Sequence, residues 1–187
     1  MSERILLVDD EPNILTALQR LLRNGLTDAA GERYQVECFT DATKALARAR
    51  ESAFSLVISD QRMPVMTGVD FLKELRQVQP DCGRIILSGY ADLNALMAAI
   101  NEAAIDRFIS KPWTDFELLN AVRQVLRIRA LVVENQRLAD QVREQRGVLS
   151  AQEAELRRLE RLEPGITHVK WGSDGSFILE DPGEVGL

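Results

Sequence analysis

The sequence predicts an α/β domain in which helices cover both faces of a doubly wound parallel sheet. Three apolar runs, at residues 5–8, 56–58 and 85–87, are continuous rather than alternating, which is typical of strands buried on both faces. Stretches with the apolar periodicity of helices separate these runs. The last stretch continues far beyond the length of an ordinary domain helix, so we also expect a long helical extension.

Five strands and five helices are expected in the domain. Weaker strands at residues 35–39 and 107–109 complete the sheet. Four helices are predicted by apolar residues spaced three and four apart, at Ile14, Leu15, Leu18, Leu21 and Leu22, at Ala42, Ala45, Leu46 and Ala49, at Phe71, Leu72 and Leu75, and at Leu93, Leu96, Met97 and Ile100. Thr114 and Glu117 have the spacing of a capping box, which predicts the start of the fifth helix. Repeated βα units imply right-handed crossovers between parallel strands.

The fifth helix is expected to continue to residue 163, because residues 114–163 contain no proline and only one glycine, Gly147. Such a helix would extend on the order of 70 Å at about 1.5 Å per residue. The core positions of a heptad repeat are occupied by Ile128, Leu131, Asn135, Leu138, Val142, Leu149, Leu156 and Leu159, with Gln145 and Gln152 at two more. One interpretation is a parallel dimeric coiled coil whose register Asn135 fixes. The other is a solvated extension of one helix, because Gln145 and Gln152 weaken the apolar seam.

The chain therefore divides into three expected parts. These are a domain at residues 1–127, a coiled-coil helix at 128–163 and a short tail at 164–187. Pro164 and Gly165 end the helix. Within the tail, two strand-like segments flank a glycine-rich turn at residues 172–175, which predicts a small β-hairpin.

Composition argues against several classes of function. The net charge of −6 disfavours a nucleic-acid partner, because such proteins usually carry basic patches. Cys38 and Cys82 form neither a disulfide framework nor a zinc pattern, and a single histidine, His168, excludes metal sites built from several imidazoles. The first apolar run is too short for a signal peptide or a membrane span, so we expect a cytoplasmic protein without membrane insertion.

Polar residues follow the predicted strands at their carboxyl ends, where ligands bind in open α/β sheets. Asp9, Asp10 and Glu11 follow the first strand, Asp60 the third, Ser88 the fourth and Lys111 the fifth. Crowded carboxylates repel one another, and a hard divalent cation with an oxygen shell, Mg²⁺, would relieve that repulsion. A carboxylate can also act as a nucleophile and form an acyl phosphate. These residues predict a phosphoryl-transfer site, in which Ser88 donates a hydrogen bond to one phosphoryl oxygen and Lys111 pairs with another.

The acidic run at residues 9–11 also has a structural interpretation, in which its carboxylates cap the first helix. The presence of Asp60 and Lys111 at other strand ends favours the site.

Four segments, taken in order, resemble the receiver domain of two-component response regulators over residues 4 to about 127. The segments are LVDDEP at 7–12, DQRMP at 60–64 with Gly68 beyond it, LSGY at 87–90 and FISKPW at 108–113. The resemblance implies a flavodoxin-like sheet with strand order 2-1-3-4-5. It also implies that Asp60 accepts a phosphoryl group from the phosphohistidine of a sensor histidine kinase or phosphotransfer protein.

The same resemblance assigns the metal ligands and the switch. Asp10 and Asp60 would bind Mg²⁺ directly, Asp9 would bind it through water, and the backbone carbonyl of Arg62 would add a ligand. The remaining assignments are the switch pair Ser88 and Phe108 and a cis peptide bond between Lys111 and Pro112.

The motif variants look most like those of receivers fused to HD-type cyclic-di-GMP phosphodiesterases or to transcriptional activators. Residues 128–187 hold one histidine, too few for such a phosphodiesterase, and the heptad does not fit a helix-turn-helix. We therefore expect a response regulator that is not an enzyme, binds no DNA and signals through a homodimeric coiled coil to an unknown downstream protein. A phosphotransfer intermediate or phosphate sink is one alternative, and a constitutive structural dimer with an unused site is another.

Overall fold

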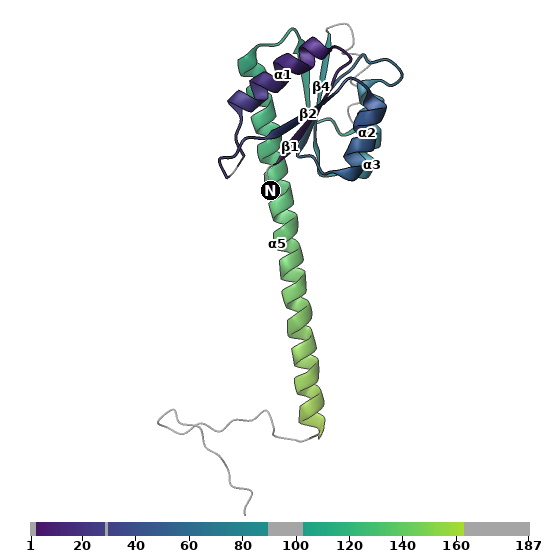
Figure 1. Ribbon diagram of the computed structural model, residues 1–187. Helices are drawn as coiled ribbons and strands as arrows, with labels where there is room; N and C mark the ends of the chain where they lie inside the picture. The colour runs from purple at the N-terminus through teal and green to yellow at the C-terminus, as the bar shows by residue number, and fades with distance from the viewer. Residues whose placement is uncertain (1–2, 29, 90–102, 163–187) are drawn as a thin grey trace, which may run out of the picture. The chain divides into compact units, whose positions relative to one another are not determined.

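A computed structural model describes residues 3–28, 30–89 and 103–162 of the chain (Figure 1). Contacts between residues divide the chain into two compact units, Met1–Asn135 and Gln136–Leu187. The first unit contains a five-stranded sheet and the helices that cover it. The predicted fourth helix, at residues 93–100, and the predicted hairpin in the tail lie outside the described residues.

The sheet is entirely parallel and has the strand order β2-β1-β3-β4-β5, which confirms the predicted fold class. Its strands are β1 (Arg4–Val8), β2 (Gln35–Phe39), β3 (Leu56–Asp60), β4 (Gly83–Gly89) and β5 (Arg107–Lys111). The three continuous apolar runs lie on the three inner strands, β1, β3 and β4, which are buried along almost their whole length. The edge strands β2 and β5 are largely half-buried, and this explains their weaker sequence signal.

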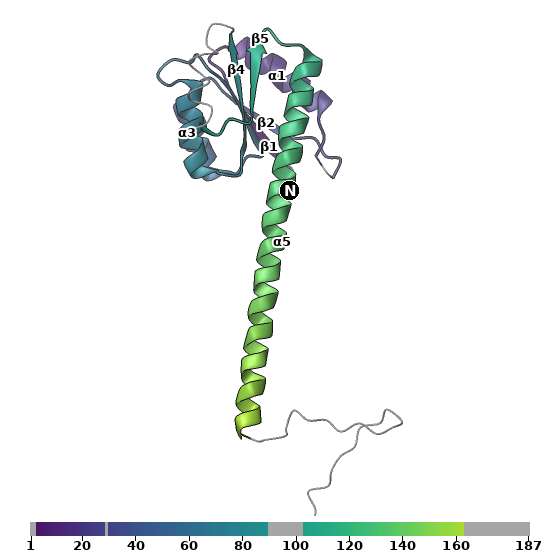
Figure 2. The same ribbon diagram turned by 180° about the vertical axis from the view of Figure 1, so that it is seen from behind.

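In the part of the chain that the structure describes, helices cover both faces of the sheet. They are α1 (Pro12–Gly25), α2 (Ala42–Glu51), α3 (Gly68–Val78) and α5 (Asp115–Leu162). The apolar stripe of α1 and four residues near the start of α5 form one core cluster with the sheet, and α2 and α3 form the other. Figures 1 and 2 show α1 and α5 on one side of the strands and α2 and α3 on the other.

Helix α5 begins as the capping spacing predicts, because the backbone N–H of Glu117 donates a 3.2 Å hydrogen bond to the side-chain oxygen of Thr114. In the first unit, two predicted heptad core residues are about half exposed, Ile128 at 53% and Leu131 at 59%. In the second unit, Leu138, Val142, Leu156 and Leu159 are between 38% and 52% exposed. No helix within the described ranges has the length and apolar character needed to span a membrane.

The edge of the sheet where the strands begin is closed by side chains that bind backbone groups. The amide of Gln79 accepts a hydrogen bond from the N–H of Phe54 at 2.8 Å and donates one to the carbonyl of Ser52 at 2.7 Å. The buried guanidinium of Arg84 donates to the carbonyl oxygens of Ala104 at 2.9 Å and Pro80 at 3.1 Å. These bonds join the ends of α2 and α3 to the starts of the strands.

Tyr34 lies just before β2 and is buried in the core on the side of α1 and α5. Burial is the largest cause of a rise in the pKa of Tyr34 to about 12. The carboxylates of Glu3 and Asp28 raise this pKa further, and the nearby Arg129 lowers it.

Replacing Tyr34 by Phe should change how stability depends on alkaline pH. A tyrosine in the unfolded chain ionises near pH 10, so the unfolded state of the native sequence releases this proton before the folded state does. Stability therefore falls as pH rises between about 10 and 12, by at most about 1.4 kcal/mol per pH unit from this group. Tyr34→Phe removes this contribution, and urea unfolding from pH 9 to 11.5 should show a shallower decline. Equal slopes in the two proteins would contradict the assignment.

Candidate functional site

The carboxyl ends of the parallel strands bring the sequence-predicted polar residues to one edge of the sheet. Asp9 directly follows β1, and Asp60, Ser88 and Lys111 are residues of β3, β4 and β5 at or near their ends. Within the register, Ser88 pairs with Ser110 and Asp60 pairs with Leu87. The apolar runs predicted these three residues just after their strands, whereas the strands extend through them.

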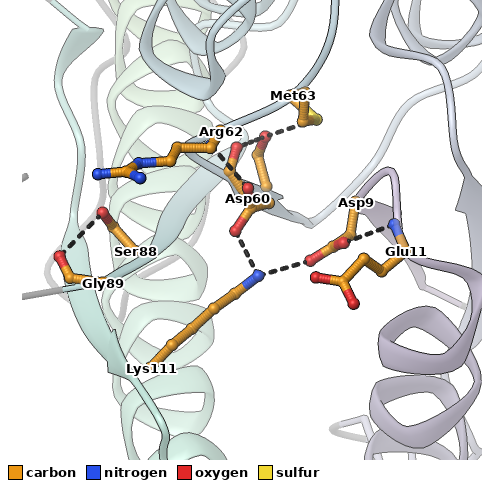
Figure 3. A network of polar contacts seen from close by, with 9 residues as sticks. Asp9, Glu11, Asp60, Arg62, Met63, Ser88, Gly89 and Lys111 are labelled. Atoms are coloured by element: carbon orange, nitrogen blue, oxygen red, sulfur yellow. Dashed lines mark hydrogen bonds and ion pairs between the residues drawn. The ribbon is translucent and has the colours of Figure 1, made fainter.

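The ammonium group of Lys111 joins two carboxylates at this edge (Figure 3). Its Nζ lies 3.0 Å from Oδ2 of Asp9 and also contacts Oδ1 of Asp60. Because β4 and β3 stand between β5 and β1, the lysine side chain reaches across the ends of two strands to make these contacts. Asp9 is 1% exposed and Asp60 is 5% exposed, so both carboxylates are nearly removed from water.

Burial and charge act in opposite directions on these groups. Burial is the strongest influence on Asp9 and raises its pKa, while hydrogen bonds from the Glu11 backbone and from Lys111 oppose the rise without cancelling it. Burial is also the strongest single influence on Lys111 and lowers its pKa. Hydrogen bonds to Asp60 and Asp9, together with the negative charges of these two carboxylates, outweigh that effect, so the pKa of Lys111 is raised and its ammonium stays charged at neutral pH.

The carboxylate of Asp60 is also held from its own side of the sheet. Its Oδ2 accepts a 2.6 Å hydrogen bond from the backbone N–H of Arg62. Its backbone carbonyl accepts a 2.9 Å bond from the hydroxyl of Ser59. Sequence reasoning did not find Ser59, because a serine inside an apolar strand carries no signal of its own.

Gly68, at the start of α3, packs directly on the backbone of Asp60. A Cβ atom at position 68 would lie 2.1 Å from the carbonyl oxygen of Asp60 and 2.9 Å from its carbonyl carbon. The N–H of Gly68 donates a 3.0 Å hydrogen bond to the carbonyl of Gln61. The absence of a side chain at residue 68 therefore sets how closely α3 approaches the site.

The other predicted site residues surround this centre at different degrees of burial. Ser88 is buried, and its hydroxyl lies 3.4 Å from the carbonyl oxygen of Gly89. Phe108 is half-buried and packs against the core cluster of α2 and α3. Asp10 is exposed, and the Lys111–Pro112 peptide bond is cis.

The alternative interpretation of the acidic run, as a helix cap, is not supported. The N-cap residue of α1 is Glu11, and its side chain makes no capping hydrogen bond. Asp9 instead accepts a 2.9 Å bond from the N–H of Glu11 and binds Lys111. Pro12 occupies the first turn, where a missing N–H costs nothing.

Among the described residues, no group of three or more His, Cys, Asp or Glu side chains is arranged to hold a metal ion. The pair Asp9 and Asp60 nevertheless offers carboxylate oxygens close together at the strand ends. Mg²⁺ in proteins commonly uses one or two carboxylates and keeps several waters. The donor set therefore fits Mg²⁺, which does not need a cage of three protein carboxylates.

A largely apolar hollow of about 490 Å³ adjoins the site and is lined by Ile14, Lys111, Pro112 and Trp113. The FISKPW motif contains Trp113 but does not predict this hollow.

Comparison with known proteins identifies the family of this chain. The model of the response regulator receiver domain matches residues 5–123. The chain belongs to the response regulator receiver family. Over 145 residues it is 37% identical to the hydrogenase transcriptional regulatory protein HoxA of Cupriavidus necator, covering 78% of this chain and 28% of that protein. Over 160 residues it is 32% identical to the response regulator protein TodT of Pseudomonas putida, covering 83% of this chain and 66% of that protein.

Solved structures agree with this membership. The receiver domain of an HD domain-containing protein from Pseudomonas fluorescens Pf-5 is 38% identical, with a TM-score of 0.61, and the match covers 70% of this chain and 98% of that one. This neighbour confirms the resemblance to receivers of HD-domain proteins. An uncharacterised protein from Neptuniibacter caesariensis is 37% identical with a TM-score of 0.64, over 71% of this chain and 93% of that one.

The chain is thus the receiver domain of a two-component response regulator with a helical extension. Receiver domains accept phosphoryl groups, typically bind Mg²⁺ at their acidic site and interact with histidine kinases or phosphotransfer proteins. They are in general signalling modules without enzymatic activity. The chain spans 28% and 26% of the two HoxA regulators, so it corresponds to only part of those proteins.

Substituting Gly68 by Ala should destabilise the domain by about 1–3 kcal/mol, because the new methyl group collides with rigid backbone at Asp60. Urea unfolding followed by circular dichroism measures the change. The matched control is Gly147→Ala in α5, where a Cβ atom meets nothing within 4 Å. In this exposed helix, alanine should keep or increase helix stability, by up to about 1 kcal/mol. Equal effects of the two substitutions would refute the packing argument.

Proposed function

We propose that Asp60 is the phosphoryl acceptor of this response regulator. The supporting observation is the pairing of its buried carboxylate with the charged ammonium of Lys111. The two carboxylate oxygens of Asp60 have different partners. One accepts a hydrogen bond from the backbone N–H of Arg62, and the other contacts the ammonium of Lys111. A nucleophile held in this way has a fixed position relative to an approaching phosphoryl group.

In the transfer, an Asp60 carboxylate oxygen attacks the phosphorus of a partner's phosphohistidine. A new P–O bond forms as the P–N bond breaks, and the imidazole leaves with its bonding electron pair and takes a proton from solvent. Lys111 is placed to pair with one phosphoryl oxygen. Ser88, at the end of β4, is placed to donate a hydrogen bond to another.

The residues that would hold Mg²⁺ are Asp10 and Asp60 directly, Asp9 through water, and the backbone carbonyl of Arg62. The bound ion would supply positive charge that lowers the repulsion between the carboxylates and the incoming anion. The exposure of Asp10 leaves its carboxylate able to turn toward such an ion.

Ser88 and Phe108 form the proposed switch. Ser88 is buried on β4, and Phe108 lies on the neighbouring β5 and is half-buried. Movement of the Ser88 hydroxyl toward a phosphoryl group would open space toward which the aromatic ring turns. Because a phenylalanine has no hydroxyl, the signal at this position would be read through packing.

We propose that the output is contact through α5, as a homodimeric coiled coil over residues 128–163 that follows the receiver at residues 1–127 and precedes the tail at 164–187. Half-exposed aliphatic residues at heptad core positions support it, because a partner helix would remove these side chains from water. The second copy of this chain and an unidentified downstream protein are then the partners, without nucleic acid. The protein would act in the cytoplasm and without an enzymatic output of its own.

Phosphorylation should add one phosphoryl mass to the native protein and none to Asp60→Asn. The protein is incubated with acetyl phosphate and Mg²⁺, and intact mass is measured. The variant presents an amide in place of the carboxylate, and an amide is a poor nucleophile. The control is Asp81→Asn, at an exposed loop position before the start of β4 and away from the carboxyl ends of the strands. This variant should keep the full mass gain. A native protein without mass gain, or a gain that persists in Asp60→Asn, would refute the proposal.

The dimer is tested with two pairs of substitutions in α5. Leu138→Gln with Val142→Gln removes two core positions, and we expect a dimer-to-monomer shift in sedimentation velocity because the apolar seam is lost. Val133→Gln with Val148→Gln removes two exposed valines of the same helix outside the core positions, and this control should remain dimeric. A monomeric native protein, or equal effects of the two pairs, would exclude the coiled coil. A dimer that phosphorylation leaves unchanged would favour the phosphate sink or the structural dimer.

A further inference from the structure

A second cationic side chain lies near Asp60, on the side away from Lys111. Figure 3 shows the side chain of Arg62 leaving the loop after β3 and extending toward Ser88 at the end of β4. In the same view, Lys111 extends from β5, below Ser88 and Gly89, and its ammonium lies between Asp60 and Asp9. The carboxylate of Asp60 therefore lies between a lysine and an arginine that come from different strand ends.

The backbone at Arg62 is fixed relative to the nucleophile. Its N–H donates the 2.6 Å hydrogen bond to Oδ2 of Asp60. The loop is also held where α3 begins, by the contact of Gly68 with the Asp60 carbonyl. The loop therefore fixes the backbone from which the Arg62 side chain extends, and that side chain is exposed.

Lys111 cannot satisfy a phosphoryl group by itself. A phosphoryl group brings about 1.5 to 2 negative charges and three acceptor oxygens. The single ammonium already contacts both Asp9 and Asp60, and Asp9 is too deeply buried to give up that partner without cost. The hydroxyl of Ser88 can donate only one hydrogen bond to the oxygens on its side.

We propose that the guanidinium of Arg62 binds the phosphoryl group on Asp60 from the Ser88 side, so that the group is held between Arg62 and Lys111. This inference rests on the proposed function of Asp60 and assigns the Arg62 side chain a role separate from its backbone carbonyl. A planar guanidinium can donate two hydrogen bonds to phosphoryl oxygens, a geometry that an ammonium does not offer. Because Arg62 is exposed, solvent screens its charge and its contribution is smaller than that of a buried cation.

The test measures binding of trifluoroberyllate, whose beryllium becomes tetrahedral when a carboxylate oxygen binds it and so mimics a phosphoryl group on that carboxylate. The full-length protein is titrated with beryllium and fluoride in the presence of Mg²⁺, and the bound form is followed by ¹⁹F nuclear magnetic resonance. Arg62→Gln should weaken binding by roughly three- to tenfold, the range expected for one solvent-screened charged hydrogen-bonding group. Arg62→Lys keeps the charge and should recover part of the affinity.

Two controls separate a direct contact from a structural effect. Arg50→Gln, at an exposed position in α2, should bind as the native protein does. The difference between native and Arg62→Gln should shrink as salt rises from 0.05 to 1 M, because the screening length falls from above about 10 Å to about 3 Å. A purely structural defect would persist at all salt concentrations and would not be relieved by lysine.

The outcomes distinguish this inference from the function on which it rests. A native protein that gains phosphoryl mass on Asp60, with equal trifluoroberyllate affinity in Arg62→Gln, overturns the role of Arg62 and leaves the acceptor in place. A folded native protein that neither gains mass nor binds trifluoroberyllate overturns both. Weaker binding in Arg62→Gln with partial recovery in Arg62→Lys and a salt-dependent gap supports the proposal.

Discussion

The contact of one ammonium group with two buried carboxylates organises the functional edge of this domain. Asp9 and Asp60 are nearly out of water, and two like charges in that position would be strongly unfavourable without a cation. Lys111 supplies the cation from β5, two strands away from β3 in order of pairing. The same contact therefore ties the edge strand to the centre of the sheet and keeps positive charge beside the proposed acceptor.

The loop after Asp60 connects the position of this residue to the position of α3. Arg62 donates its N–H to the Asp60 carboxylate, and Gly68 rests against the Asp60 carbonyl at a distance that leaves no room for a side chain. The start of α3 and the site are thus parts of one packed arrangement. A change at Asp60 that shifts its backbone must also shift α3, or break this packing.

Much of the fold could be predicted from the sequence, because buried strands and helices show characteristic patterns of apolar residues. Inner strands such as Leu56–Asp60 read as continuous apolar runs, and the spacing of Thr114 and Glu117 predicted the start of α5. The strand-end rule also gathered Asp9, Asp60, Ser88 and Lys111 at the correct edge. The reach of Lys111 to both carboxylates could not be predicted, since it depends on how far a flexible side chain crosses the neighbouring strands.

Other features lay beyond sequence reasoning for similar reasons. The close approach of Gly68 to Asp60 is a backbone contact, and a glycine in a motif does not say what it touches. The hollow beside Trp113 needs α1 and the loop after β5 to meet, which no local pattern records. Exposed Leu138 and Val142 follow a heptad, but one chain does not reveal whether a second helix covers them.

The edge of the sheet where the strands begin and the edge where they end differ in what their polar side chains bind. Where the strands begin, Gln79 and Arg84 bond to several backbone groups that have no freedom to leave. Where the strands end, each buried carboxylate accepts one backbone N–H and also binds the tip of Lys111, a long side chain that can move without disturbing the backbone. At one edge the side chains are therefore held by bonds to the backbone. At the other, partners can be exchanged without unfolding anything, and it is there that chemistry can be reversible.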